Sequence, residues 1–320
     1  MFGRRLITKK EETKMNRRKF LLSSTVAAAA SASLPALAST TEHFSEKQRP
    51  VDTMNRIEGW TQGKVKPVKV RNLMIGEGRP KIFAPTTDKN EADMLKTLKN
   101  FSTIKALDMV EVRIDYLGRL SPAKFAEITK KAYEAAGSKA VLVTLRNGTD
   151  GGPFIAEDQY YGEVYEAIIR DGKADVIDIE LFRDRAMIER LVKLAHAKGI
   201  KVIISEHEFK FTPDEAELIR RMQLEQAAGA DILKIAVMAN SPEDALAVMT
   251  ATAKMRHYYS DRPMLTIGMG KWGAMTRLAG EGFGSDLTVV SVGGKASAPG
   301  QIPADECLAV LGTLHRAMNP

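Results

Sequence analysis

KVIISEHEFKFTPDEAELIRRMQLEQAAGADILKIA, residues 201–236, is the stretch of sequence that decides the fold. Its two ends, 201–205 and 231–236, are nearly continuous apolar runs of the kind that form buried parallel strands. Thr212-Pro213 between them indicates a helix start, because a hydroxyl can cap an orphan backbone N–H and proline has no N–H to lose. Gly229 suits the helix end, where the backbone often needs a positive φ. The stretch therefore predicts a strand–helix–strand unit with parallel strands.

The same alternation runs through residues 80–320. Ser121-Pro122 and Ser241-Pro242 are further helix starts, and Gly137 and Gly199 suit helix ends. Six more β-rich runs bring the predicted strands to eight: 81–85, 109–114, 140–145, 175–179, 264–268 and 287–291. Eight such units match a closed barrel better than a doubly wound sheet, and no G-x-G-x-x-G follows the first strand, as a Rossmann fold would require. We therefore predict an α/β fold, a (β/α)8 TIM barrel over residues 80–320.

The net charge of the chain, +7, is concentrated in its first 38 residues. These hold eight Lys or Arg against two Glu, whereas the remainder holds 39 basic and 38 acidic residues. A basic surface on the barrel is therefore not expected, and nucleic acid is excluded as a partner. Hydrophobic residues make up 44% of the chain, which is enough for a sizeable core.

Residues 1–38 have the pattern of a signal peptide. The basic stretch 16–19 precedes Phe20-Leu21, and a mild apolar run then ends in Ala36-Leu37-Ala38, as at a cleavage site. The pair Arg17-Arg18 resembles a twin-arginine signal, so we expect the twin-arginine export machinery as a partner and a periplasmic or otherwise exported mature chain. The true start could be Met15. The apolar run is too short and too polar to remain as a membrane span, and an alanine-rich amphipathic helix is the alternative interpretation.

Residues 39–79 are polar and show no convincing period, so they are predicted to form a linker or an extension on the barrel surface. Cys307 is the only cysteine, which excludes an intramolecular disulfide and a zinc site built on several thiolates. The five histidines show no short metal-ligand spacing. No metal and no cofactor are expected.

Polar residues at the carboxyl ends of the predicted strands are the candidates for a site, because active sites of such barrels lie at that end. Arginines follow three different strands, which favours a small anionic, hydroxyl-rich substrate. The residues concerned are Glu111, Arg113, Asp115, Arg146, Asp150, Asp178, Glu180, His207, Lys234, Arg277, Ser297 and Gln301.

Lys234 is the most informative of them. It stands among Leu233, Ile235 and Ala236 inside a strand, where a charged amine is expensive to bury. A desolvated lysine can attack a carbonyl and form a Schiff base. The alternative is a structural lysine at the strand end, whose ammonium group reaches solvent or a carboxylate. His207 is on the preceding strand, so both side chains could face one pocket, where a base suits proton abstraction next to a carbonyl.

These segments together resemble the type I 3-dehydroquinate dehydratases over roughly residues 80–318. The resemblance rests on E-x-R-x-D at 111–115, on T-x-R at 144–146 followed by Gly151-Gly152, and on His207-Glu208-Phe209 followed by Thr212-Pro213. Lys234, the G-x-x-[ST]-R pattern at 273–277 and the A-S-A-P-G-Q loop at 296–301 complete it. A single motif would be weak, but six in order form a specific pattern.

The resemblance implies an enzyme that eliminates water from 3-dehydroquinate to give 3-dehydroshikimate, without a metal or organic cofactor. By this resemblance Lys234 forms the Schiff base, and His207 is the acid and base. Arg277 binds the substrate carboxylate, and Ser297 and Gln301 close over it. By the same resemblance, Glu111, Arg113 and Arg146 hold the ring hydroxyls and the carbonyl region of the substrate. A homodimer is also implied.

Asp150 departs from the family pattern, which usually has a glutamate there to orient the histidine. Aspartate is one methylene shorter, so either the loop moves inward or the contact with His207 lengthens. Thr276 in place of serine keeps a hydroxyl. Glu180 matches a recurring family position, but the resemblance assigns it no role. A salt bridge that supports the scaffold is an equally good interpretation.

Two other functions fit part of the pattern. Another lysine-imine barrel enzyme, such as a class I aldolase, would share Lys234 but has no reason to keep the 296–301 loop. A non-catalytic exported binder of the same ligand would keep the arginines and could lose Lys234 or His207. An exported enzyme would fit catabolism of external quinate or shikimate better than aromatic biosynthesis.

Overall fold

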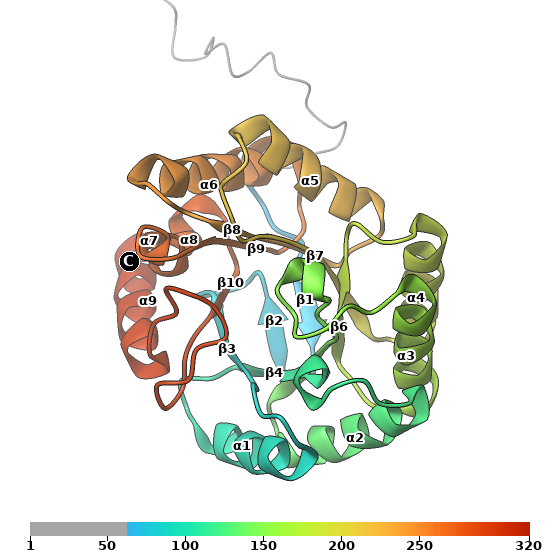
Figure 1. The fold of residues 1–320 in the computed structure, drawn as a ribbon. Helices are drawn as coiled ribbons and strands as arrows, with labels where there is room; N and C mark the ends of the chain where they lie inside the picture. Colours follow the sequence, from blue (N-terminus) through green and yellow to red (C-terminus); the bar gives the residue numbers. More distant parts are fainter. Residues whose placement is uncertain (1–62) are drawn as a thin grey trace, which may run out of the picture. The chain divides into compact units, whose positions relative to one another are not determined.

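A computed structural model describes residues 63–320, which contain a barrel of eight parallel strands (Figure 1). The strands follow one another around the barrel in the order β10-β3-β4-β5-β6-β7-β8-β9. Their bounds are β3 Lys81–Pro85, β4 Met109–Arg113, β5 Ala140–Thr144, β6 Val176–Glu180, β7 Lys201–Glu208, β8 Ile232–Met238, β9 Met264–Met269 and β10 Leu287–Val289. The predicted (β/α)8 TIM barrel is confirmed, with each of the eight predicted strands in place and its ends shifted by at most three residues.

The seam of the barrel lies between β9 and β10, which share no regular ladder. The backbone N–H of Asp286 donates to the carbonyl of Met264 at 2.7 Å across this seam. The hydroxyl of Ser285 accepts from the backbone N–H of Thr266 at 3.2 Å. These bonds take the place of a longer ladder and close the barrel at its amino-terminal edge.

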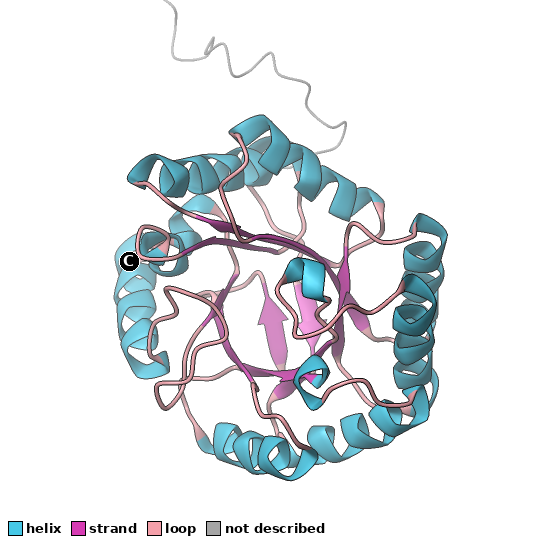
Figure 2. Cartoon of the chain, viewed as in Figure 1, coloured by secondary structure: helices cyan, strands magenta, loops and turns pink. Residues whose placement is uncertain are grey.

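Helices cover the outside of the barrel (Figure 2). They are α1 Glu91–Thr103, α2 Pro122–Ala135, α3 Asp158–Asp171, α4 Arg185–Ala197, α5 Glu215–Ala227, α6 Pro242–Lys254, α7 Ala274–Leu278, α8 Gly280–Phe283 and α9 Ala304–Met318. Short turns of other helix types lie at Ile114–Leu117 (η2), Gly148–Asp150 (η3) and Met255–Tyr259 (η4). Within residues 63–320, no helix has the length and apolar character to cross a membrane.

Two of the three predicted helix starts are confirmed. Ser121 caps α2, and Ser241 forms a capping box with Asp244 at the start of α6. The third prediction is wrong, because α5 is capped by Asp214 instead of Thr212. The hydroxyl of Thr212 donates to the carbonyl of Met238 at the end of β8 at 2.8 Å, so a tertiary contact has replaced the local cap.

Two apolar clusters hold the barrel together. The larger one lies between the strands and the helices and includes Tyr161, Tyr165 and Phe125, all fully buried. The smaller one fills the barrel interior toward the amino-terminal ends of the strands, with Phe83 and Met109 among its members. The interior is therefore packed with side chains below the polar strand ends, as in other barrels of this type.

A β-hairpin underlies the barrel at its amino-terminal end. β1 Val68–Val70 and β2 Leu73–Ile75 pair antiparallel, and Val70 and Ile75 join the interior cluster. Arg71 at the turn forms an ion pair of 2.6 Å with Asp175, just before β6, and its guanidinium lies over the Tyr133 ring. For residues 39–79 the sequence predicts a linker or an extension on the barrel surface, without strands, because strands of three residues are too short to show an alternating pattern. The predicted signal peptide, residues 1–38, lies outside the described residues.

We expect Ile75→Ala to lower the free energy of unfolding by about 2–5 kcal/mol, because Ile75 is fully buried and alanine would leave a cavity. Urea denaturation followed by circular dichroism measures this loss. Lys69→Ala, at an exposed position of the same hairpin, is the matched control and should leave the stability close to that of the parent. Equal stability of the two variants would contradict the inference that the β1–β2 hairpin is a plug, that is, that it closes the amino-terminal end of the barrel by packing into its interior.

Candidate active site

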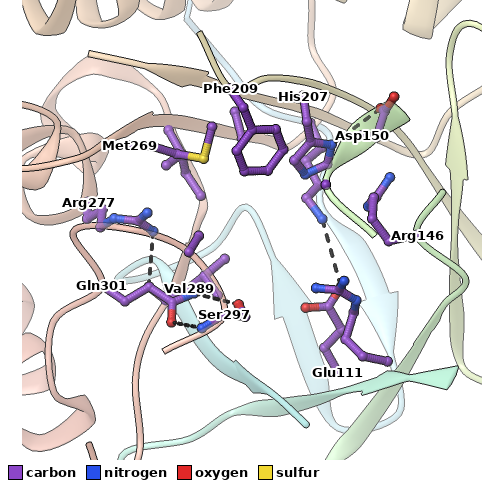
Figure 3. A pocket seen from close by; sticks show the side chains of 16 residues that line it. Glu111, Arg146, Asp150, His207, Phe209, Met269, Arg277, Val289, Ser297 and Gln301 are labelled. Atoms are coloured by element: carbon purple, nitrogen blue, oxygen red, sulfur yellow. Dashed lines mark hydrogen bonds and ion pairs between the residues drawn. The ribbon is translucent and has the colours of Figure 1, made fainter. Parts of the chain in front are cut away.

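A pocket at the carboxyl ends of the strands has an empty volume of about 530 Å³. Nine of the twelve candidates at the predicted strand ends line this pocket (Figure 3), and Asp115, Asp178 and Glu180 do not. The nine are Glu111, Arg113, Arg146, Asp150, His207, Lys234, Arg277, Ser297 and Gln301. They come from six different strand ends or the loops that follow, so the barrel brings together residues as far as 190 positions apart in the sequence.

The amine of Lys234 lies at the bottom of the pocket and is 95% buried as a side chain. It forms an ion pair of 2.7 Å with Asp178 of β6, and Glu111 lies 3.9 Å away. Asp178 is one of the strand-end candidates, but the resemblance assigns it no role. The alternative that the lysine reaches a carboxylate is therefore met in part, but this carboxylate is itself buried beside the pocket and not at the surface.

Asp178 is shared by two cations. Its second oxygen lies 2.8 Å from Arg146, and it also accepts from the hydroxyl of Ser205 at 2.5 Å. Burial alone would raise the pKa of this carboxyl, but Arg146 and Lys234 outweigh it and hold the pKa well below its usual range. Asp178 is therefore a permanent anion that fixes both cations.

Glu180 holds Arg146 from the other side. One of its oxygens accepts from Arg146 at 3.2 Å and from the backbone N–H of Asn147 at 2.7 Å. The other accepts from Arg183 at 2.9 Å. The scaffold salt bridge proposed as one interpretation of Glu180 is therefore present, and the same carboxylate anchors Asn147 in the loop after β5.

Glu111 and Arg113 are also engaged within the protein. Glu111 accepts from the hydroxyl of Thr144 at 2.7 Å. Arg113 makes two hydrogen bonds, of 2.9 and 2.8 Å, to the carboxylate of Asp115. Both residues still line the pocket, but the planar fork of Arg113 already has its carboxylate.

His207 is an uncharged group among charges. Burial, and then the positive charge of Arg146, lower the pKa of its ring to about 3. Asp150 opposes this shift, but its nearest oxygen lies 3.7 Å from Nδ1, too far for a hydrogen bond. Nδ1 is buried and has no hydrogen-bond partner among residues 63–320. Of the two outcomes predicted for the shorter aspartate, the structure has the longer contact.

Arg277 differs from the other two arginines of the pocket. Its guanidinium donates only to the backbone carbonyls of Val289 and Pro299, each at 3.3 Å, and no carboxylate pairs with it in residues 63–320. Its Nε is buried without a partner, and burial lowers the pKa of the guanidinium to about 10. A buried cation without an anion is costly, and it can be relieved by an anionic ligand.

The loop after β10 lies beside Arg277. The amide of Gln301 closes this loop, because its oxygen accepts from the backbone N–H of Ser297 and its nitrogen donates to the Ser297 hydroxyl, both at 2.9 Å. Gly300 has φ +78, and a Cβ there would lie 2.4 Å from the carbonyl oxygen of Gly270. Only glycine permits this close approach of the two loops.

Apolar side chains complete the wall of the pocket, and these were not predicted. Phe209 stacks on the His207 ring with centroids 6.2 Å apart, and Met269 and Ile267 lie on β9. A Cβ on Gly151 would lie 2.4 Å from the Phe209 ring, so the loop after β5 packs directly on this ring. The wall keeps water from the polar groups and so strengthens their interactions.

Comparison with known proteins shows the family of this chain. Residues 82–318 match the type I 3-dehydroquinase family profile. A 3-dehydroquinate dehydratase of Clostridioides difficile is 39% identical over 255 residues, which are 79% of this chain and 98% of that protein. One of Bacillus licheniformis is 40% identical over 256 residues, or 78% of this chain and 98% of that protein.

Solved structures agree with the sequence comparison. A type I 3-dehydroquinate dehydratase from Clostridium difficile has a TM-score of 0.75 at 38% identity and covers 79% of this chain and 99% of its own. The 3-dehydroquinate dehydratase from Geobacillus kaustophilus has a TM-score of 0.73 at 33% identity and covers 80% of this chain and 99% of its own.

We expect His207 to make the protein less stable as the pH falls from about 6.5 toward 3. The unfolded ring binds a proton below about 6.5, whereas the folded ring stays neutral until about 3, so stability falls by up to about 1.4 kcal/mol per pH unit in this window. His207→Gln should remove this part of the pH dependence, measured by urea unfolding at several pH values. His196→Gln, at an exposed ring on α4, is the control. If the free energy of unfolding depended on pH equally in both variants, His207 would not be the cause.

Proposed function

The chain belongs to the type I 3-dehydroquinase family and is a hydro-lyase that acts on 3-dehydroquinate, and we propose that it does so through an imine formed by Lys234. The observation that carries the proposal is the content of the pocket: a buried amine, a neutral imidazole and an unpaired guanidinium face one cavity. In a dehydration next to a ketone these three groups can serve as electron sink, base and anion holder.

Lys234 is the nucleophile in this proposal. Its amine gives its proton to a base, attacks the ketone carbon, and forms a C=N bond as the ketone oxygen leaves as water. The iminium is a cation at the position of the former ammonium, so Asp178, at 2.7 Å, stabilises it as it stabilised the lysine. The Clostridium difficile structure contains covalent modified comenic acid, which is in keeping with a covalent step in such a pocket.

His207 moves the protons. As a neutral imidazole it can take the proton from the carbon next to the iminium, and the C–H electrons then flow into the C=N bond. The resulting imidazolium returns its proton to the departing hydroxyl, which leaves as water. Hydrolysis of the conjugated imine consumes the water released in its formation and frees 3-dehydroshikimate. One water is lost overall, and His207 and Lys234 return to their starting states.

Arg277 binds the substrate carboxylate in this proposal. It is the arginine of the pocket that has no carboxylate of its own, whereas Arg113 and Arg146 are paired with Asp115 and Asp178. Ser297 and Gln301 close over the same end of the substrate. Glu111, Arg113 and Arg146 then face the hydroxyls and the carbonyl region of the substrate. They act as fixed polar groups, because each is already hydrogen-bonded or ion-paired within the protein.

The decisive experiment mixes the protein with 3-dehydroquinate and follows the ultraviolet absorbance of the conjugated enone. We expect steady turnover with the parent and none with Lys234→Ala, and borohydride should trap a covalent adduct only when Lys234 is present. Asp178 keeps Arg146 and Ser205 in the variant, so the barrel should remain folded by circular dichroism. Turnover by a folded Lys234→Ala protein would refute the imine, and ligand binding without turnover by the parent would identify a binder.

We also propose that the chain is exported and serves catabolism of external quinate or shikimate. The support lies in the sequence alone: Arg17-Arg18 followed by an apolar run and Ala36-Leu37-Ala38. We expect cell fractionation to find the chain, cleaved before Ser39, in the exported fraction, and the doubly substituted Arg17→Lys, Arg18→Lys chain in the cytoplasm. Equal distribution of the two chains between the fractions would count against export by this signal. Unchanged growth on quinate after deletion of the gene would count against a role in catabolism.

A further inference from the structure

The loop that carries Asp150 is built around the buried side chain of Asn147. The amide oxygen of Asn147 accepts from the backbone N–H of Ala156 at 2.8 Å, across the far end of the loop. Its amide nitrogen donates to the hydroxyl of Thr149 at 2.5 Å. The backbone N–H of Asn147 is held by Glu180, and the residue is only 4% exposed. Asn147 is therefore a fixed point from which the Thr149 hydroxyl is placed.

Thr149 passes this constraint to Asp150. A hydroxyl has one proton, and since the Thr149 oxygen accepts from Asn147, its own proton is free to be donated. The acceptor is Oδ1 of Asp150, 3.2 Å away. The second carboxylate oxygen, Oδ2, then faces Nδ1 of His207 across 3.7 Å. The four residues form a line from the loop anchor to the imidazole.

This orientation matters because the carboxylate is short. A gap of 3.7 Å is too long for a hydrogen bond, so the attraction between Asp150 and the ring depends on where the charge points. The side chain of Asp150 is also 19% exposed, which leaves it free to turn toward solvent when nothing holds it. Burial alone would raise the pKa of the Asp150 carboxyl, but the neighbouring His207 and then Arg146 outweigh it, and the pKa is lowered.

We propose that Thr149 is a positioning residue for the dehydration: its hydroxyl fixes one oxygen of Asp150 and thereby aims the other at His207. When His207 takes the substrate proton, the imidazolium gains a partner that is already oriented. The inference rests on the proposed function, because it concerns the proton transfer by His207. It adds a residue whose side chain does not line the pocket and which acts through Asp150 alone.

The test uses Thr149→Val, which keeps the shape of the side chain and removes the hydroxyl. We expect kcat to fall by about fivefold, the size of effect typical of the loss of one hydrogen bond, with KM unchanged. Substrate deuterated at the carbon that loses the proton should show a larger isotope effect on kcat, because proton removal is slowed. Borohydride trapping of Lys234 should stay as in the parent. Thr149→Ser should restore the parent values.

Thr103→Val is the matched control, since this exposed hydroxyl on α1 donates only to the carbonyl of Asn100. The second arm places Thr149→Val in an Asp150→Glu background, where the longer side chain reaches His207 without help. There the loss in kcat should be less than about twofold.

The outcomes separate the two proposals. Unchanged kcat and isotope effect in Thr149→Val, with an active parent, would overturn the role of Thr149 and leave the proposed function standing. An equal loss in both backgrounds would also overturn it, because the hydroxyl would then act on the loop and not on the reach of the carboxylate. A parent without turnover would overturn the proposed function, and the role of Thr149 with it.

Discussion

The buried carboxylate of Asp178 between two cations is the interaction on which the site depends. It lies within 2.8 Å of both Lys234 and Arg146, and all three side chains are almost fully buried. Removing one member of such a group leaves a charge unpaired in a medium of low polarity, so the three positions are fixed together. Two consequences reach the chemistry. The lysine is held at the pocket floor in one place. Burial, and then the charge of Arg146, lower the pKa of the neighbouring His207, so its imidazole is neutral and able to accept a proton.

The opposite end of the barrel supports this arrangement through packing. Phe83 and Met109 fill the interior below the polar residues, and the β1–β2 hairpin adds Val70 and Ile75 from beneath. An interior without this plug would admit water to the floor of the pocket, and water would screen the Asp178 ion pairs. The hairpin therefore contributes to the site although none of its residues lines the pocket. Its anchor, Arg71 on Asp175 just before β6, ties the plug to the strand that carries Asp178.

The fold and the predicted site could be reached from the sequence for a physical reason: strictly alternating elements imply parallel strands, and parallel strands present their carboxyl ends together. That rule placed Lys234, His207 and Arg277 in one pocket before any coordinates. What it could not supply is pairing. The sequence does not tell which carboxylate reaches Lys234, because Asp178 and Glu180 both lie on β6. The strand register even places Glu180 in line with Ser205 and Lys234, yet the lysine pairs with Asp178, and Glu180 binds Arg146 and Arg183 instead. For the same reason it missed the cap at Asp214 and the hairpin of three-residue strands, where tertiary contacts decide.

The distribution of charge in the pocket also orients a substrate. Figure 3 shows Arg277 on the side of the pocket opposite to Arg146. Arg146 is neutralised by Asp178 and Glu180, and Arg113 by Asp115, so the positive charge that remains for a ligand is concentrated at Arg277 and the 296–301 loop. A ligand with one carboxylate gains most by placing it there, and its ring then extends toward β7 and β8, where His207 and Lys234 are. A ketone across the ring from the carboxylate would thus meet the lysine by electrostatics alone, before any hydroxyl is recognised. In the proposed mechanism the uneven pairing of the three arginines therefore orients the substrate, and Lys234 reacts at the ketone end.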